Sequence, residues 1–163
     1  MKMKVTNRCA RKDKAGKHND RNFNLVNAPH IDQSKVNQNK YWTYNGDQEH
    51  SFAEVEKEFY ARHFTDFIDV QNKKNSESRH KDRNKTLDSY YHGARTRPED
   101  QLLQIGDKNN HATPEELWEC AMTYMERFDQ IYGDKCKILD MALHLDETTP
   151  HVHIRRVWIA EDE

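Results

Sequence analysis

The chain has 163 residues, of which 34% are hydrophobic and 33% are charged, and its mean hydropathy is −1.20. This length suits a single domain, and no stretch approaches the roughly 18 consecutive apolar residues that a membrane-spanning helix needs. The N-terminal residues 1–14 contain no apolar segment of the kind that a signal peptide carries. The three cysteines, Cys9, Cys120 and Cys136, lack metal-binding spacing, which indicates reduced thiols and a cytoplasmic protein.

The net charge of −2 conceals a strong asymmetry along the chain. Residues 1–97 contain 20 Lys and Arg against 13 Asp and Glu, whereas residues 98–163 contain 6 against 15. A basic N-terminal half favours contact with a polyanion such as nucleic acid, although a solvated charged surface would give the same composition.

The first elements are predicted from alternation and from turn residues. Residues 3–9 alternate between apolar and polar side chains, which predicts a half-buried strand. Residues 10–38 show no sustained period, and we expect a long functional loop there. Residues 40–44 are aromatic and β-branched and precede Asn45-Gly46, which predicts a strand that ends in a turn.

The middle of the chain contains one clear amphipathic helix. Ser51 and Glu54 form a capping-box pattern, and apolar side chains then recur every three or four residues through 52–70. Residues 71–86 are polar, and a second helix is expected from about Ser78 to Tyr91.

The last third predicts a strand, a helix and two more strands. Residues 101–105 indicate a short strand, and Thr113 with Pro114 starts a helix that runs to Gly133. Residues 137–145 and 151–159 are the final strands. The order of elements predicts an α+β fold in which a central antiparallel sheet of about five strands is covered by helices.

The sequence HLDETTPHVH at 144–153 joins these last two strands and contains three histidines. Alternation puts Leu139, Met141, Leu143 and Leu145 on the core face of the first strand and Val152, Ile154 and Trp158 on the core face of the second. His144, His151 and His153 then share the opposite face. Three neutral imidazoles suit a divalent metal with positions left open for substrate, and Asp146 and Glu147 could orient them or bind directly. A surface hairpin rich in histidine is the alternative.

Two motifs resemble those of the Mob/Pre family, the plasmid mobilisation relaxases that are also called plasmid recombination enzymes. HLDETTPHVH is similar to the family pattern H-x-D-E-x-x-P-H-x-H, and KHNDR at 17–21 is similar to H-N-[ED]-R. The middle family motif, around an Asn-Tyr pair, is only loosely matched by NKYWTY at 39–44. The resemblance implies an HUH-type relaxase domain over residues 1–163, with further segments expected beyond the C-terminal end.

This resemblance implies specific chemistry. The protein would nick one DNA strand at an origin of transfer and stay attached to the 5′ end, with His144, His151 and His153 holding Mn or Mg. His18 would be the nucleophile, Arg21 would steady the phosphate and Glu147 would assist. The implied partners are single-stranded or hairpin origin DNA and other mobilisation or conjugation proteins. Tyr41, Tyr44, Tyr90 and Tyr91 are rival nucleophiles.

Contacts with DNA are expected from basic side chains, which position the phosphates, and from aromatic side chains, on which bases stack. The candidates are Lys12, Lys14, Lys17, Arg21, Trp42, Tyr44, Arg95 and Arg155, with Lys81, Arg83 and Arg97 as further possibilities. Two other functions stay open: an HUH replication initiator or transposase, which would form a tyrosine adduct, and a non-catalytic fragment that binds the origin.

Overall fold

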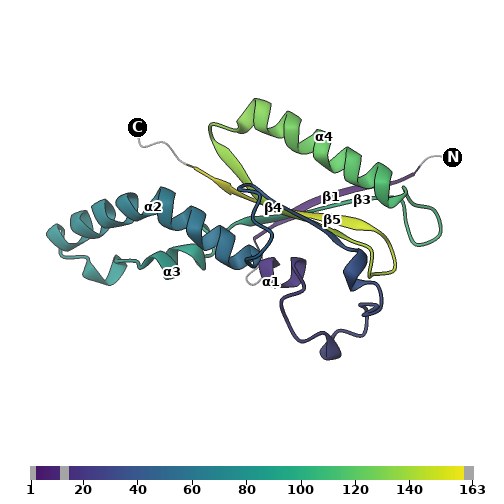
Figure 1. Ribbon diagram of the computed structural model, residues 1–163. Helices are drawn as coiled ribbons and strands as arrows, with labels where there is room; N and C mark the ends of the chain where they lie inside the picture. The colour runs from purple at the N-terminus through teal and green to yellow at the C-terminus, as the bar shows by residue number, and fades with distance from the viewer. Residues whose placement is uncertain (1–2, 12–14, 160–163) are drawn as a thin grey trace.

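A computed structural model describes residues 3–11 and 15–159 (Figure 1). Its centre is a five-stranded antiparallel sheet in the order β1-β3-β5-β4-β2. The strands are β1 (Val5–Ala10), β2 (Lys40–Thr43), β3 (Glu99–Ile105), β4 (Cys136–His144) and β5 (His151–Trp158). The predicted α+β architecture is confirmed, and the last two strands, β4 and β5, lie inside the sheet.

Helices cover both faces of the sheet. Helix α4 (Pro114–Tyr132) lies on one face, and α1 (Ala15–Asn19), α2 (Phe52–Glu77) and α3 (Leu87–Tyr91) lie on the other (Figure 1). Two apolar clusters follow from this arrangement. Leu117, Ala121 and Phe128 of α4 pack on the first face, and Phe59, Phe64 and Ile68 of α2 pack with Tyr91 and Val157 on the second. In the described parts of the chain, no helix has the length and apolar character to cross a membrane.

The predicted helix starts are confirmed in detail. Ser51 and Thr113 each accept a hydrogen bond from the backbone N–H three residues later, and Glu54 and Glu116 each accept one from the backbone N–H of their capping residue. These reciprocal contacts satisfy N–H groups that the first helical turn leaves without an intrahelical partner.

Two predictions about the polar segments were wrong. Residues 10–38 are more than a loop, because they contain α1 and two short 3-10 turns at Leu25–Asn27 and Val36–Gln38. Helix α2 does not end at residue 70 but continues through Glu77, and the expected helix from Ser78 is a 3-10 turn followed by the short α3. These polar stretches are helical without an apolar period, so periodicity could not show them.

Strand β4 also departs from simple alternation. Its register with β5 shifts between Ile138 and Asp140, so Ile138 joins the α4-side core whereas Leu139 packs on the α2 side. Such a bulge moves the residues before it to the other face of the sheet. Trp158, predicted to face the core, is 42% exposed at the end of β5.

A buried polar cluster lies on the face of the sheet that α2 covers, which is also the face that carries the histidines. Arg155 of β5 donates to Glu56 of α2 through Nε at 2.5 Å and Nη2 at 3.0 Å, and the hydroxyl of Tyr91 donates to the same carboxylate. Asp140 of β4 lies beside Glu56 and is fully buried, and within the described residues neither of its oxygens has a donor. Burial, with the neighbouring Glu56 carboxylate, raises the pKa of Asp140 well above its ordinary value.

We predict that Asp140→Asn stabilises the fold at neutral pH. Because the folded-state pKa of Asp140 is raised, the folded protein binds this proton more tightly than the unfolded chain, and the stability it contributes is lost as pH rises. Asparagine supplies a permanent donor to Glu56, which should add about 1–3 kcal/mol to the free energy of unfolding at pH 7–8 and less near pH 4. Urea unfolding at both pH values checks this, and an equal change at both would contradict the mechanism.

Candidate metal centre

Three imidazoles converge where β4 ends and β5 begins. His144 is the last residue of β4 and pairs in register with His151, while His153 pairs with Ala142 two residues back. All three side chains therefore lie on the predicted non-core face, and each residue is buried, with at most 6% exposed. Their ring centroids are 5.1, 5.2 and 5.1 Å apart.

These separations fit a shared ion. A metal about 2.1 Å from a ring nitrogen lies about 3.2 Å from the ring centre, so three imidazoles around it have centroids roughly 4.5–5.2 Å apart at ligand angles between octahedral and tetrahedral. The alternative of a solvated hairpin rich in histidine does not fit, because all three rings are removed from water.

The outward-facing nitrogen of each ring is held by an oxygen. His144 Nε2 lies 2.7 Å from the Asn19 carbonyl, His151 Nδ1 lies 2.9 Å from the Thr149 carbonyl, and His153 Nδ1 lies 3.0 Å from Asp100 Oδ2. Since carbonyls and carboxylates only accept, each of these nitrogens carries the hydrogen. In a neutral ring, the remaining nitrogen then presents a lone pair, which is the arrangement of metal-binding histidines.

Two of these lone pairs face each other. His144 Nδ1 and His151 Nε2 are 3.3 Å apart, and both are acceptors in the tautomers that their carbonyl contacts require. Burial lowers the pKa of His151, and burial together with Arg21 lowers the pKa of His144 far below its ordinary value. A proton is therefore disfavoured between the two nitrogens, and a cation with neutral ligands fits the space instead.

Glu147 adds a carboxylate to the same space. Its Oε1 lies 3.9 Å from His144 Nδ1, 3.8 Å from His151 Nε2 and 3.9 Å from His18 Nε2. Potential ligand atoms approach within 4.8 Å of one another in two overlapping groups, His144 with Glu147 and His151, and His144 with His18 and His153.

Arg21 fixes this carboxylate and does not point to solvent. Its Nε and Nη2 donate to Asp146 at 2.8 and 2.7 Å, Nη2 also donates to Glu147 at 2.8 Å, and Nη1 donates to the His18 carbonyl at 3.0 Å. The side chain is 3% exposed. The prediction that Arg21 contacts a phosphate is corrected: its donors are engaged inside the protein, and it orients Glu147 and His18. Asp146 is likewise held by Arg21, and both of its oxygens accept hydrogen bonds from Arg21 or Asn39.

His18, on α1, stands at the open side of the cluster. Its ring centroid is 5.9 Å from that of His144 and 5.8 Å from that of His153, and its side chain is 40% exposed. Partial burial, followed by the charge of Arg21, lowers its pKa to about 4. An imidazole that is neutral at pH 7 and open to solvent can act as a nucleophile or as a further ligand.

Three supporting residues were not predicted. Asn19 Nδ2 donates to Asp100 Oδ1 at 2.8 Å, so one residue supports His144 through its carbonyl and His153 through Asp100. Asn39 donates to Asp146 at 2.8 Å and accepts from the Leu145 N–H at 2.8 Å. The sequence contained a signal for each of these residues. Asn19 and Asn39 lie inside the two motifs quoted above, and Asp100 is a carboxylate next to a predicted strand.

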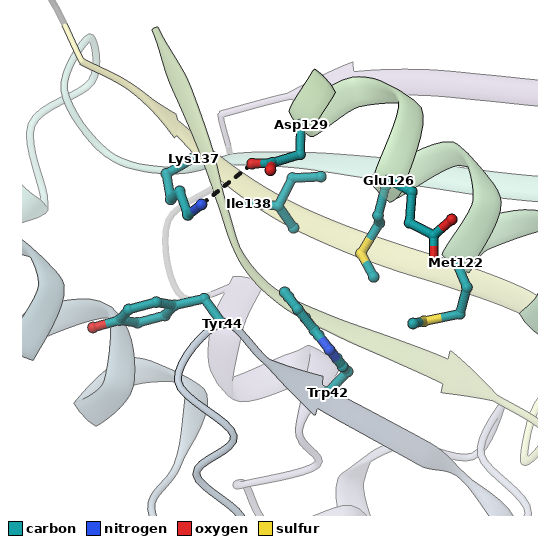
Figure 2. Close-up of a pocket in the computed structure, with 8 residues that line it drawn as sticks. Trp42, Tyr44, Met122, Glu126, Asp129, Lys137 and Ile138 are labelled. Atoms are coloured by element: carbon teal, nitrogen blue, oxygen red, sulfur yellow. Dashed lines mark hydrogen bonds and ion pairs between the residues drawn. The ribbon is translucent and has the colours of Figure 1, made fainter. Parts of the chain in front are cut away.

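Several predicted DNA contacts are not available as expected. Arg155 is 2% exposed and paired with Glu56, so it cannot reach a phosphate. Trp42 pairs with Met141 and packs on the α4-side core. Figure 2 shows Trp42 and Tyr44 lining a hollow beside α4, and no histidine lines that hollow. Lys17 and Arg95 are exposed as expected. Lys12 and Lys14 lie outside the described residues.

Comparison with known proteins gives one family and one fold. A family model described as plasmid recombination enzyme matches residues 65–163, which include the three clustered histidines. The relaxase domain of MobM, solved with Mn and a 22-nucleotide oriT DNA of plasmid pMV158 at pH 5.5, has 20% identity and a TM-score of 0.58, covering 93% of this chain and 68% of that chain. The same domain with a 23-nucleotide DNA at pH 6.5 has 19% identity and a TM-score of 0.59, covering 97% and 70%. No curated protein matches.

Replacing Asp100 by Asn is predicted to weaken metal binding without unfolding the protein. The neutral amide of asparagine is a weaker acceptor for the His153 N–H than the Asp100 carboxylate. Loss of such support for a metal ligand typically costs about 10–100-fold in metal affinity. Calorimetric titration with Mn²⁺ measures the change, and Asp69→Asn on the exposed surface of α2 is the matched control. Equal affinity in the Asp100→Asn and control variants would contradict the role given to Asp100.

Proposed function

Because the chain belongs to the plasmid recombination enzyme family, we propose that it is a metal-dependent DNA relaxase that nicks one strand at a plasmid or mobile-element origin and stays attached to the 5′ end. The observation that carries this proposal is the set of three buried imidazoles, two of which aim ring nitrogens at each other, beside a partly exposed His18 with a lowered pKa. The similarity to relaxase domains solved with Mn and oriT DNA gives the metal and the substrate class.

In this proposal His144, His151 and His153 hold Mn²⁺ or Mg²⁺, and Glu147 assists as a ligand or as an acceptor. When bound, the metal supplies positive charge to the non-bridging oxygens of the scissile phosphate. The side chains of this protein position the groups that take part in the reaction. Arg21 keeps Glu147 and His18 at fixed positions, and Asn19 and Asp100 keep the rings of His144 and His153 oriented.

The covalent step is a transesterification-like exchange at phosphorus. An unprotonated nitrogen of His18 attacks, a P–N bond forms and the P–O3′ bond breaks. The electron pair leaves with the 3′ oxygen, which takes up a proton, and the imidazole loses its ring N–H proton. The 5′ phosphoryl group remains on His18 as a phosphoramidate, and its energy is available for a later strand transfer. With this step, the proposed activity is that of a site- and strand-specific DNA endonuclease and strand transferase.

The geometry favours His18 over Tyr41, Tyr44 and Tyr91. Tyr91 is buried, donates to Glu56, and has a pKa raised by burial, so its hydroxyl is a poor nucleophile. Tyr41 lies on the histidine face but packs against Phe52, and burial raises its pKa as well. Tyr44 packs on Phe59 with its hydroxyl buried.

Adduct capture tests the proposal without knowledge of the origin. Purified protein with Mn²⁺ is incubated with a randomised single-stranded DNA library, and covalent complexes are recovered under denaturing conditions, sequenced and mapped by peptide mass spectrometry. We expect an adduct on His18 that is lost in His18→Ala and in His151→Ala, with folding retained by circular dichroism. A tyrosine adduct would favour an initiator or transposase, and the absence of any adduct would favour a binding fragment.

The pH dependence of adduct formation follows from His18. Since its pKa is lowered to about 4, the ring is neutral across pH 5.5–7, and the single-turnover rate at saturating Mn²⁺ should change less than about twofold over that range. With an unperturbed histidine as the nucleophile, the single-turnover rate would fall about tenfold between pH 7 and pH 5.5, because the ring becomes protonated. A rate that follows an apparent pKa near 6.5 would contradict the environment described for His18.

A further inference from the structure

Two adjoining hollows on the molecule are lined by cations and lie away from the histidines. One is lined by Arg83 and Lys85 together with the amides of Gln71, Asn72 and Asn75. The other is lined by Arg11, Arg95, Arg97 and Arg156. Both linings include Tyr90 and Thr96, so the hollows adjoin each other, and together we call them the arginine groove.

Among the described residues, the linings of the arginine groove contain more cations than carboxylates. Glu99 is the acidic residue in these linings, and it already contacts Arg11 at 3.0 Å and Arg156 at 3.2 Å. Within residues 3–11 and 15–159, no carboxylate forms an ion pair with Arg83, Lys85 or Arg95. A concave surface lined by one sign of charge attracts and concentrates a polyanion.

The walls of the groove are ordered by internal contacts. Asn72 accepts from the Lys85 N–H and donates to the Lys85 carbonyl, both at 2.8 Å. Tyr60 donates to the Thr96 carbonyl at 2.5 Å, and Thr96 donates to the Tyr90 carbonyl. Lys85 Nζ lies 5.7 Å from the ring centre of Tyr90, and Trp158 offers a ring that is 42% exposed. Guanidinium groups beside such rings suit phosphates and stacked bases.

We infer that the arginine groove binds the phosphodiester backbone of origin DNA outside the nick site. This inference rests on the proposed function and extends it. From His153 to Trp158 the groove lies about 17 Å along β5 from the metal centre, which corresponds to about five base-pair steps of B-DNA. The groove therefore contributes affinity and position, and takes no part in the covalent step.

The test removes two charges that form no ion pair with a carboxylate among the described residues. Lys85→Gln/Arg95→Gln is compared with Lys108→Gln/Arg127→Gln, which removes two exposed charges on α4 and on the loop before it. Binding to a 30-nucleotide oligodeoxythymidylate and to a 30-base-pair mixed-sequence duplex is measured by fluorescence anisotropy over a range of salt. For the groove variant we expect about tenfold weaker binding and a log–log salt slope smaller by about 1.8 on the duplex or 1.4 on the single strand.

The probe that changes identifies whether duplex or single strand occupies the groove. If the charge-retaining variant Lys85→Arg/Arg95→Lys regains the wild-type salt slope, the result would support charge as the cause of the weaker binding. Unchanged slopes on both probes, or an equal change in the control variant, would overturn the inference. Adduct formation at saturating protein should be retained in the groove variant, and its loss would also overturn the inference. If the wild type forms no adduct, the proposed function fails, while the salt slopes still report on the groove.

Discussion

The pairing of β4 with β5 is the constraint on which the site depends. In-register contact of His144 with His151, and of Ala142 with His153, brings three imidazoles together from a segment of ten residues. A shift of one residue would turn one strand's histidines to the α4 side and separate the set. The bulge between Ile138 and Asp140 lies four to six residues before His144, so the irregularity is absorbed away from the cluster.

The face of the sheet that carries the histidines contains an unusually large number of buried polar side chains for a core layer. The histidines continue into Asp100 and Asn19, and then into Arg155, Glu56 and Asp140. Buried charge is costly unless each group is paired, and here the pairing is nearly complete. Among the described residues, the buried atoms of this cluster without a hydrogen-bond partner are Asn19 Oδ1, Arg155 Nη1 and both carboxylate oxygens of Asp140. The raised pKa of Asp140 gives the cluster a pH-dependent stability.

The site is assembled from both ends of the chain. Arg21 reaches Asp146 and Glu147 across 125 and 126 positions, and Asn39 reaches Asp146 across 107. Arg21 has a φ of +59°, a left-handed conformation that is strained for a side chain of this size and is held by its five donor contacts. The N-terminal segment therefore closes over a metal centre that the C-terminal strands build.

The sequence by itself determined the sheet class, the two long helix starts and the face shared by His144, His151 and His153, because alternation and capping are local properties. It also indicated His18 through its motif. Only the tertiary structure decided that Arg21 supports Glu147 in place of a phosphate, that Arg155 is buried against Glu56, and that Asp100 orients His153. These roles depend on which partner each polar side chain meets across more than 50 residues, and no local pattern encodes that meeting.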